Sequence, residues 1–383
     1  MLPEVSGIVP FKLNRLFSNV WVLYKGSGYH TLAEAREKEV FMYALRSDEK
    51  VCATCPSPDC LLKCQYMKWD KETAHEEMMK VVKGEDSGVL KECVTCYACE
   101  EYCRRGNHPF YLIGERREEK GIYTAPRPIT NQWINMTQMQ GKQMVGKITD
   151  RVFSSCFIPA LGGMVSGEIF KDLAGSIVFG AEFMCPAVHT HFAKMSVIKE
   201  RLPMVMENFR KLGVKEVICL HDECYGTYTS IAPAYGIEVP FKPVYYMDFL
   251  LARLKELKDK IKPLNIKAAY QRPCSNRLIP DKHHLAKEIL DFIGVELPER
   301  EYQDENCLCC ADILRSISGY RLANDVQQRN LEDMLQTGAE YCVFNCPACQ
   351  STLSEKVRKK GLKPIHIIDL CKMAIGEKGG AAT

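Results

Sequence analysis

The cysteines constrain this chain more than any other feature, because 20 of its 383 residues are cysteines. Eight of them stand in two quartets, Cys52-x2-Cys55-x4-Cys60-x3-Cys64 and Cys93-x2-Cys96-x2-Cys99-x3-Cys103. Disulfide frameworks are typical of small secreted domains, whereas large intracellular chains use thiolates for metal or redox chemistry. The first residues, MLPE, contain neither the basic nor the apolar segment of a secretory signal. We therefore expect an intracellular protein whose cysteines bind metals or clusters.

The spacing of the second quartet is typical of a two-cluster ferredoxin, in which three thiolates converge on one centre and the fourth points to another. The first quartet has two extra residues, and no proline follows Cys64 or Cys103. A pair of zinc sites is the alternative, but zinc modules favour paired Cys-x2-Cys knuckles. Crossed ligation predicts one 4Fe-4S cubane on Cys52, Cys55, Cys60 and Cys103, and another on Cys93, Cys96, Cys99 and Cys64.

The sequence around the quartets predicts helices. Residues 72–83, between the quartets, form a helical pattern that ends at Gly84, so we expect a helical ferredoxin over residues 51–108. In the N-terminal extension, residues 1–50, Thr31 and Glu34 form a capping box before a helix. Residues 109–150, with Pro126, Pro128 and several amides, are expected to be a connector, and residues 377–383 a flexible tail.

An internal repeat divides the rest of the chain. Residues 242–249 (KPVYYMDF) recur as 363–370 (KPIHIIDL), which predicts two repeats, 151–262 and 263–376, that meet near Pro263. Strand patterns at 151–154, 176–179, 216–220, 266–270 and 341–344 alternate with helical ones such as 247–262 and 283–293. The expected fold class is α+β: an α-helical two-cluster ferredoxin domain followed by two pseudo-symmetric α/β repeats.

Composition excludes other classes of protein. Apolar residues make up 46% and charged residues 26%, as in a soluble globular chain. No apolar stretch of about 18 residues spans a bilayer, and residues 154–188 are interrupted by charges. The net charge of +3 gives no basic stripe for nucleic acid. There is no Gly-x-Gly-x-x-Gly or Walker loop for a nucleotide, so electrons are expected to arrive from a partner.

The last quarter carries a second cysteine set: a lone cysteine, an adjacent pair and a Cys-Pro-x-Cys motif. One tetrahedral or cubane site needs four ligands, and this set offers five. The set resembles that of the CCG-domain proteins typified by the catalytic subunit of heterodisulfide reductase, although Ala311 stands where the family motif has glycine. By this resemblance, the ligands of a noncubane 4Fe-4S cluster that cleaves a disulfide, and hence the catalytic residues, are Cys274, Cys309, Cys310, Cys346 and Cys349.

The layout over residues 51–376 resembles that of the fused, membrane-partnered heterodisulfide reductase subunit. The resemblance implies a complex with a flavoprotein or a quinone-linked membrane subunit, a small disulfide or thiol substrate, and a cytoplasmic location, peripheral to the membrane through the partner. Relatives with this layout also serve glycerol-3-phosphate and glycolate dehydrogenases, sulfite reductase and benzoyl-CoA reductase.

The first repeat is degenerate, because Met184 and His221 stand where the second has cysteines. Cys219, His189 and His191 are nearby alternates as ligands. Four candidate ligands suit a further 4Fe-4S cluster or a zinc ion, or a decayed site kept for packing: Cys156, Cys185, His221 and Cys224. Cys307, Cys342 and Cys371 fit no template and are expected to be small buried apolar residues.

The sequence thus predicts an iron-sulfur oxidoreductase subunit, in which two cubanes pass electrons to the C-terminal cluster for disulfide or thiol chemistry. The main alternative is a pure electron relay between a flavoprotein or quinone-linked partner and a separate reductase. A third hypothesis, from another class, is a zinc-stabilised structural protein.

Overall fold

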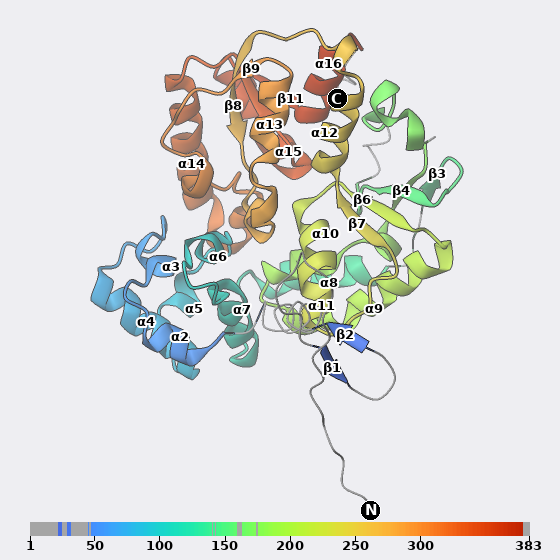
Figure 1. Cartoon of the computed structure of the whole chain (residues 1–383). Coiled ribbons are helices and arrows are strands. Elements are labelled where there is room, and N and C mark those ends of the chain that lie inside the picture. Colours follow the sequence, from blue (N-terminus) through green and yellow to red (C-terminus); the bar gives the residue numbers. More distant parts are fainter. Residues whose placement is uncertain are drawn as a thin grey trace, which may run out of the picture.

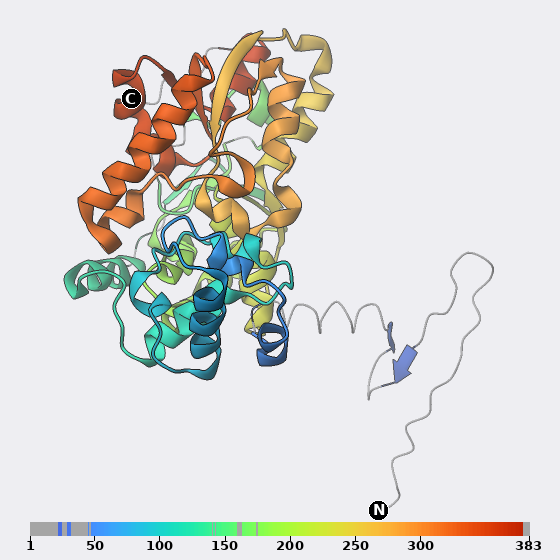
Figure 2. The same cartoon turned by 90° about the vertical axis from the view of Figure 1, so that its left-hand side faces the viewer.

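The structure is a computed structural model that describes residues 22–24, 29–31, 45, 47–139, 141, 143–158, 163–173 and 175–377. Figure 1 shows the N-terminal helices beside two α/β halves, and Figure 2 shows the second half above the helical part. Thr31 ends a short hairpin, β1 (Val22–Tyr24) with β2 (Tyr29–Thr31). The predicted helix after Thr31 and the predicted tail lie almost entirely outside the described residues. No helix in the described part of the chain is long and apolar enough to cross a bilayer.

The N-terminal cysteines lie in a helical region. Its helices are α2 (Glu49–Ala53), α3 (Asp59–Leu62), α4 (Lys71–Lys83), α5 (Val89–Glu92) and α6 (Ala98–Tyr102). The Asp70 side chain accepts the Thr73 N–H at 2.7 Å to start α4, and Gly84 ends it with a left-handed φ of 73°. Met78 and Val82, one turn apart, are both buried against α7 and α5. Residues 51–108, all described, contain no strand, as the sequence predicts.

The expected connector, residues 109–150, contains two further helices. Helix α7 (Pro109–Glu119) packs Leu112 and Ile113 into the helical core, so it extends the N-terminal domain. Its buried Arg117 donates to the carbonyl oxygens of Leu90 and Cys93 at 2.8 and 2.7 Å. Helix α8 (Arg127–Gln138) follows, and then β3 (Gln143–Val145). These elements connect the N-terminal domain to the first repeat, as expected of a connector, but they are regular helices and a strand.

Two parallel sheets with the same strand order form the two repeats. In the first, β5 (Ile177–Phe179), β4 (Arg151–Ser154), β6 (Glu216–Cys219) and β7 (Lys242–Tyr245) lie side by side. In the second, β9 (Val295–Glu296), β8 (Ile266–Gln271), β10 (Tyr341–Phe344) and β11 (Lys363–His366) do the same. Strand β3 adds an antiparallel edge to the first sheet only. The five predicted strands are confirmed within one residue at each end.

Helices connect and cover the strands. The first repeat contains α9 (Met195–Leu212), α10 (Asp222–Gly226), α11 (Ala232–Ala234) and α12 (Tyr246–Glu256). The second contains α13 (Leu285–Phe292), α14 (Asp312–Gln336), α15 (Pro347–Lys359) and α16 (Ile367–Ala374). The helix expected at 247–262 ends earlier, at Glu256, and a 3-10 turn, Lys258–Lys260, follows it.

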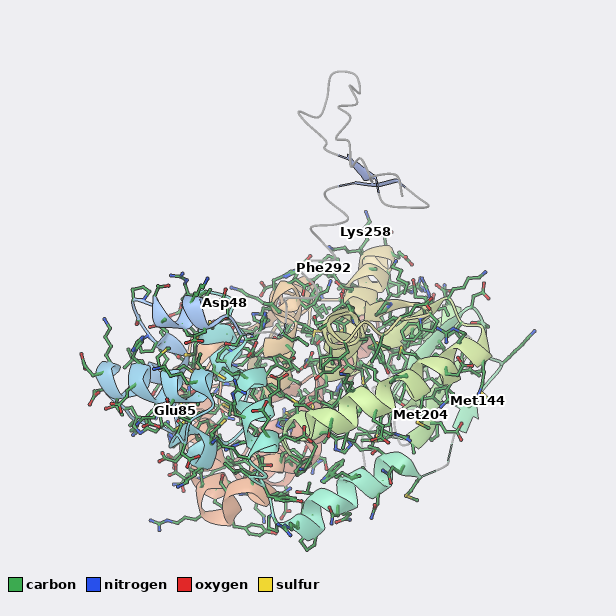
Figure 3. All side chains as sticks on the ribbon, turned by 90° about the horizontal axis from the view of Figure 1, so that it is seen from below. Asp48, Glu85, Met144, Met204, Lys258 and Phe292 are labelled. Carbon is green, nitrogen blue, oxygen red and sulfur yellow. The ribbon has the colours of Figure 1, made fainter. Side chains whose placement is uncertain are left out.

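The two repeats share one hydrophobic core. Leu250 and Leu254 of α12 pack in the same buried cluster as Ile289 of α13 and Leu370 of α16. Figure 3 shows the N-terminal domain, with Asp48 and Glu85, on one side of the first repeat, which exposes Met204 of α9 and Met144 of β3 on the other. The repeats are therefore fixed against each other, and the helical domain lies against both.

Candidate iron-sulfur centres and the cavity between the repeats

The thiols predicted for the second cubane line one small cavity. Cys64, Cys93, Cys96 and Cys99 all line a space of about 20 Å³, and Cys60 of the first quartet lines it as well. Backbone N–H groups approach two of them: Met67 N–H lies 3.4 Å from Cys64 Sγ, and Thr95 N–H lies 3.4 Å from Cys93 Sγ. Such donors stabilise thiolate charge, so this four-sulfur set fits a 4Fe-4S cubane.

The thiols predicted for the first cubane also group together. Burial, and then the charges of Cys103, Cys52 and Cys55, raise the pKa of the Cys60 thiol. Asn107 connects two of the four, because its Nδ2 lies 2.9 Å from Cys52 Sγ and its backbone N–H 3.3 Å from Cys103 Sγ. Cys103 thus lies with the first quartet and Cys64 with the second, which is the crossed arrangement that the spacing predicts.

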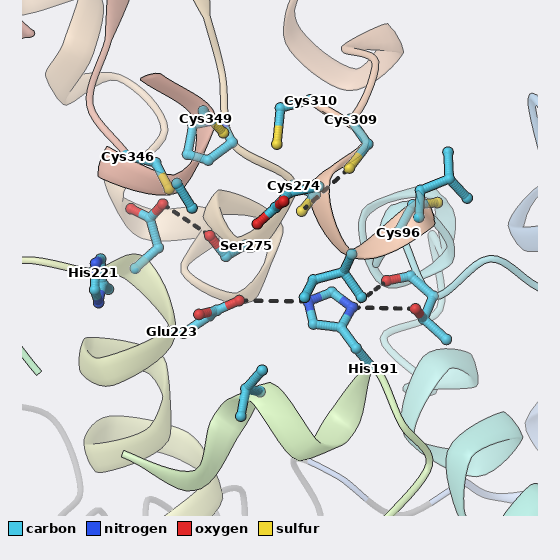
Figure 4. A pocket seen from close by; sticks show the side chains of 18 of the residues that line it. Cys96, His191, His221, Glu223, Cys274, Ser275, Cys309, Cys310, Cys346 and Cys349 are labelled. Carbon is cyan, nitrogen blue, oxygen red and sulfur yellow. Dashed lines mark hydrogen bonds and ion pairs between the residues drawn. The ribbon is translucent and has the colours of Figure 1, made fainter. Parts of the chain in front are cut away.

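The five thiols of the second repeat lie near one another on one side of a cavity (Figure 4), and three of them follow β8 or β10 in the chain. Cys274 begins a 3-10 turn after β8, Cys309 and Cys310 precede α14, and Cys346 and Cys349 occupy the start of α15. Cys309 Sγ lies 4.0 Å from Cys274 Sγ. Cys310 interacts with Cys309 and Cys349, and Cys349 with Cys346. The structure therefore brings together all five residues of the predicted catalytic set, and this donor set fits a cluster with more than four ligands.

Backbone geometry accounts for the position that is glycine in the family motif. Ala311, directly after the cysteine pair, has a φ of 66°, in the left-handed region that favours glycine. In this conformation its N–H donates to Cys309 Sγ at 3.3 Å. Hydrogen bonds with Cys274 and Cys310 lower the pKa of the Cys309 thiol well below its ordinary value. Ala311 keeps the turn that points a donor at the cluster site.

Three thiols of the first repeat are packed more tightly. Cys185 Sγ lies 3.0 Å from Cys224 Sγ and 3.9 Å from Cys156 Sγ. All three are buried, and their ligand atoms lie within 4.8 Å of one another. His221 Nδ1 is 3.9 Å from Cys224 Sγ, so His221 lies next to one of the three thiols but outside the group whose ligand atoms are all within 4.8 Å of one another. Three thiols and an imidazole suit one metal ion or a cubane.

A cavity of about 110 Å³ lies between the two repeats and the N-terminal domain. The row of five thiols forms one wall, and His221, Glu223 and His191 form the facing wall (Figure 4). His191 Nε2 lies 3.5 Å from Glu223 Oε1, and its Nδ1 lies 2.9 Å from the Thr95 carbonyl oxygen. His221 therefore borders this cavity as well as the site of the first repeat, which the sequence did not predict.

The three alternative ligands that the sequence offered for the first repeat lie in different places. His191 lines the cavity, whereas His189 contacts Thr137 Oγ1 at 3.2 Å, and burial lowers its pKa to about 4. Cys219 is buried at the end of β6. The three cysteines without a template, Cys307, Cys342 and Cys371, are 0–2% exposed, as expected for small apolar residues.

Sequence reasoning missed an ionic cluster that joins the N-terminal domain to the second repeat. Glu101 of α6 accepts from Arg272 at 3.0 Å and from Arg277 at 3.1 Å. Arg277 also donates to the carbonyl oxygens of Cys96, Glu305 and Cys307. The partners are 171 and 176 residues apart, so no local pattern reveals them. The cluster fixes the second quartet next to the five-thiol row.

Comparisons with known proteins agree with this layout. Residues 268–354 match the family model of the cysteine-rich domain, CCG. The chain is 22% identical to a subunit of the fumarate reductase (CoM/CoB) of Methanothermobacter marburgensis, over 85% of this chain and 72% of that protein. It is 27% identical to a subunit of the dihydromethanophenazine:CoB--CoM heterodisulfide reductase of Methanosarcina barkeri, over 45% of this chain and 43% of that one.

Among solved structures, a hypothetical protein from Helicobacter pylori matches with a TM-score of 0.47 and 11% identity, over 76% of this chain and 62% of that one. The segment that matches the family model, 268–354, contains all five thiols of the row, from Cys274 to Cys349. Residues 268–354 of the chain thus resemble the CCG domain, and the chain is similar to a subunit of a fumarate reductase (CoM/CoB) and to a subunit of a heterodisulfide reductase.

Proposed function

We propose that the chain is an iron-sulfur redox subunit in which two N-terminal cubanes pass single electrons to a C-terminal noncubane cluster. There, a disulfide takes up two electrons and two protons and becomes two thiols, or two thiols give them up in the reverse direction. One observation carries this proposal: Tyr66, Val94 and Cys96 line both the cavity of the second quartet and the cavity of the five-thiol row. A ligand of one predicted centre thus borders the space of the next.

The protein's own groups prepare the terminal site. When bound, an iron-sulfur cluster supplies single-electron steps and an iron able to meet a sulfur atom. Two thiols of the row, Cys310 and Cys349, are 5% and 2% exposed, whereas Cys274, Cys309 and Cys346 are half-buried beside the cavity. The Ala311 N–H stabilises negative charge on Cys309, and Arg277 holds the second quartet in place.

The first repeat suits a different centre. Its three buried thiols and His221 favour a 4Fe-4S cubane or a zinc ion rather than a five-ligand cluster. We infer that this centre is structural or relaying, since its thiols are buried and the open cavity lies beyond His221.

A second candidate function is a pure relay. The relative from Methanothermobacter marburgensis is named as one subunit of a fumarate reductase. By analogy, this chain would transfer electrons between a flavoprotein or quinone-linked partner and a separate reductase, from a cytoplasmic position. In that case a cluster on the five-thiol row passes electrons onward and contacts no substrate.

Substitution of one cysteine separates the two functions. Cys309→Ser, in the full chain purified without oxygen, should leave the two cubanes reducible while turnover with a disulfide stops. Cys371→Ser, a buried cysteine outside all the sites, is the matched control. Low-temperature electron paramagnetic resonance and disulfide reduction measure the two effects. Normal disulfide turnover in Cys309→Ser, with the other clusters intact, would show that the five-thiol row does not carry the disulfide chemistry.

A further inference from the structure

A centre on five thiols depends on how far apart its two outermost ligands are held. Contacts between sulfur atoms order the five: Cys309 lies 4.0 Å from Cys274, Cys310 interacts with Cys309 and Cys349, and Cys349 interacts with Cys346. Cys274 and Cys346 are therefore the two ends. One lies in the turn after β8 and the other directly before α15, so no single helix or strand fixes their separation.

A buried carboxylate of the first repeat joins the residues that stand next to these two ends. Ser275 follows the first end in the chain, and its hydroxyl donates to Asp222 Oδ2 at 3.2 Å (Figure 4). The Tyr245 hydroxyl donates to the other carboxylate oxygen, Oδ1, and accepts from Nδ2 of Asn345 at 3.3 Å. Asn345 directly precedes the second end. We call these four side chains, Ser275, Asp222, Tyr245 and Asn345, the carboxylate bridge.

The carboxylate bridge is buried and connects the two repeats. Asp222 begins α10 and Tyr245 ends β7, both in the first repeat, whereas Ser275 and Asn345 belong to the second. Each of the four residues is at most 6% exposed, so water competes little for their hydrogen bonds. Because a buried carboxylate without partners is costly, these contacts hold the four groups in one arrangement.

The bridge acts in one direction only. The first residue of α10 is Asp222, but the first residue of the equivalent α15 is Pro347, whose side chain accepts no hydrogen bond. At the end of β11, His366 stands where β7 has Tyr245. The first repeat therefore supports the thiols of the second with two side chains that the second repeat does not offer in return.

We propose that Asp222 and Tyr245 are positioning residues for the terminal cluster, because through Ser275 and Asn345 they fix the separation of the two outermost thiols. This inference rests on the proposed function and adds two residues of the degenerate first repeat to the site of the second. Hydrogen-bonding groups behind the ligands of a metal site typically change its affinity for the metal by about 10–100-fold.

Loss of iron to a chelator tests the proposal on the full chain purified without oxygen. Bathophenanthroline disulfonate removes the iron, and low-temperature electron paramagnetic resonance follows the decay of the signal that Cys309→Ser abolishes. Tyr245→Phe and Ser275→Ala should each speed this decay about tenfold, because each opens the bridge. Ser275→Thr keeps a hydroxyl and should decay at close to the wild-type rate. The signals of the two N-terminal cubanes should decay at the wild-type rate in every variant.

A double variant distinguishes one bridge from two separate contacts. Because Tyr245→Phe and Ser275→Ala interrupt the same chain of hydrogen bonds, their combination should again speed the decay about tenfold, whereas independent contacts would multiply to about a hundredfold. Tyr228→Phe is the matched control, since Tyr228 is 1% exposed and its hydroxyl has no hydrogen-bond partner among the described residues.

Circular dichroism checks the fold of each variant, and if Tyr245→Phe does not fold, the pair Ser275→Ala and Ser275→Thr decides. Wild-type decay in the bridge variants, an equal acceleration in Tyr228→Phe, or a hundredfold effect in the double variant would show that the positioning role is wrong while the cluster itself is present. A wild-type protein without any signal that depends on Cys309 would instead overturn the proposed function, and this inference with it.

Discussion

The two repeats place side chains after equivalent strands but differ in what those side chains offer. After β4 and β6 the first repeat presents Cys156, His221 and Cys224, whereas after β8 and β10 the second presents Cys274, Cys346 and Cys349. In the first, three thiols lie within 4.8 Å of one another and are buried. In the second, five thiols border an accessible cavity. The same strand order therefore carries a buried three-thiol group in the first repeat and five thiols beside a cavity in the second, and the sequences differ at Met184 and His221, where the second repeat has Cys309 and Cys346.

The largest effect on disulfide turnover should come from replacing one of two equivalent cysteines by alanine. Cys224 and Cys349 occupy the same position in α10 and α15, and both are at most 2% exposed. We expect Cys349→Ala to lower disulfide turnover by a factor of about 100 or more, because it opens the row of five thiols. Cys224→Ala should lower it by less than about tenfold. Initial rates of disulfide turnover on anaerobic protein measure both variants. Equal losses of rate would mean that the two repeats contribute alike to the chemistry.

The next effect concerns how each repeat is attached to the N-terminal domain. The second repeat is attached through the buried ion pairs of Glu101, whereas the first is attached through hydrogen bonds such as that of Thr95 with His191 and that of Ser196 with Glu118. Arg277→Met removes a buried donor to Glu101 and to three carbonyl groups, so the free energy of unfolding should fall by about 3 kcal/mol. Arg104→Met, which breaks an ion pair of an arginine that is 64% exposed, should cost less than about 1 kcal/mol.

Denaturant unfolding of the two arginine variants, loaded equally with iron, provides this measurement. Similar losses in both would show that the interface does not depend on the Glu101 cluster.

A smaller effect concerns the pH dependence of the free energy of unfolding, to which only the second repeat contributes at this helix cap. His366 caps α16 where the first repeat has Tyr245, and burial lowers the pKa of His366 from 6.5 to about 3. The unfolded chain therefore takes up a proton below about pH 6.5 that the folded chain refuses, and stability falls as the pH drops toward 3. Above pH 7 the group contributes no pH dependence.

His366→Asn keeps an oxygen that can cap α16 and removes the titration. Between pH 6.5 and 5 the variant should lose less stability than the wild type, by about 1 kcal/mol per pH unit. His284→Asn, at an exposed position, is the control. Urea unfolding at pH 7, 6 and 5 measures the slopes, and parallel slopes for wild type and His366→Asn would contradict the assignment.

Local patterns predicted a large part of the fold. Strands β4 and β10 have the predicted bounds, and α4 ends at Gly84 as expected, because caps and periodicity act within a few residues. Helix α8 was missed, since prolines suggested a connector. Pro126 precedes that helix and Pro128 lies in its first turn, where no backbone N–H partner is needed.

The site could be predicted only in part. The cysteine sets follow from spacing and from the resemblance, and the structure gathers each set. The wall that faces the five thiols depends on contacts between distant residues: His191 with Thr95, 96 positions away, and Glu223 with His191. Such contacts depend on how the domains pack, and no single-sequence pattern encodes them.

We propose that the two repeats hold different centres, of which only the second carries the two-electron chemistry. Low-temperature electron paramagnetic resonance, with redox titration of the wild type, Cys185→Ala and Cys310→Ala, tests this most directly, because these residues are equivalent in the repeats. The account predicts that the signal which responds to added thiol disappears in Cys310→Ala and persists in Cys185→Ala, while both cubane signals remain in each. Loss of the thiol-responsive signal in Cys185→Ala, with the cubanes intact, would contradict it.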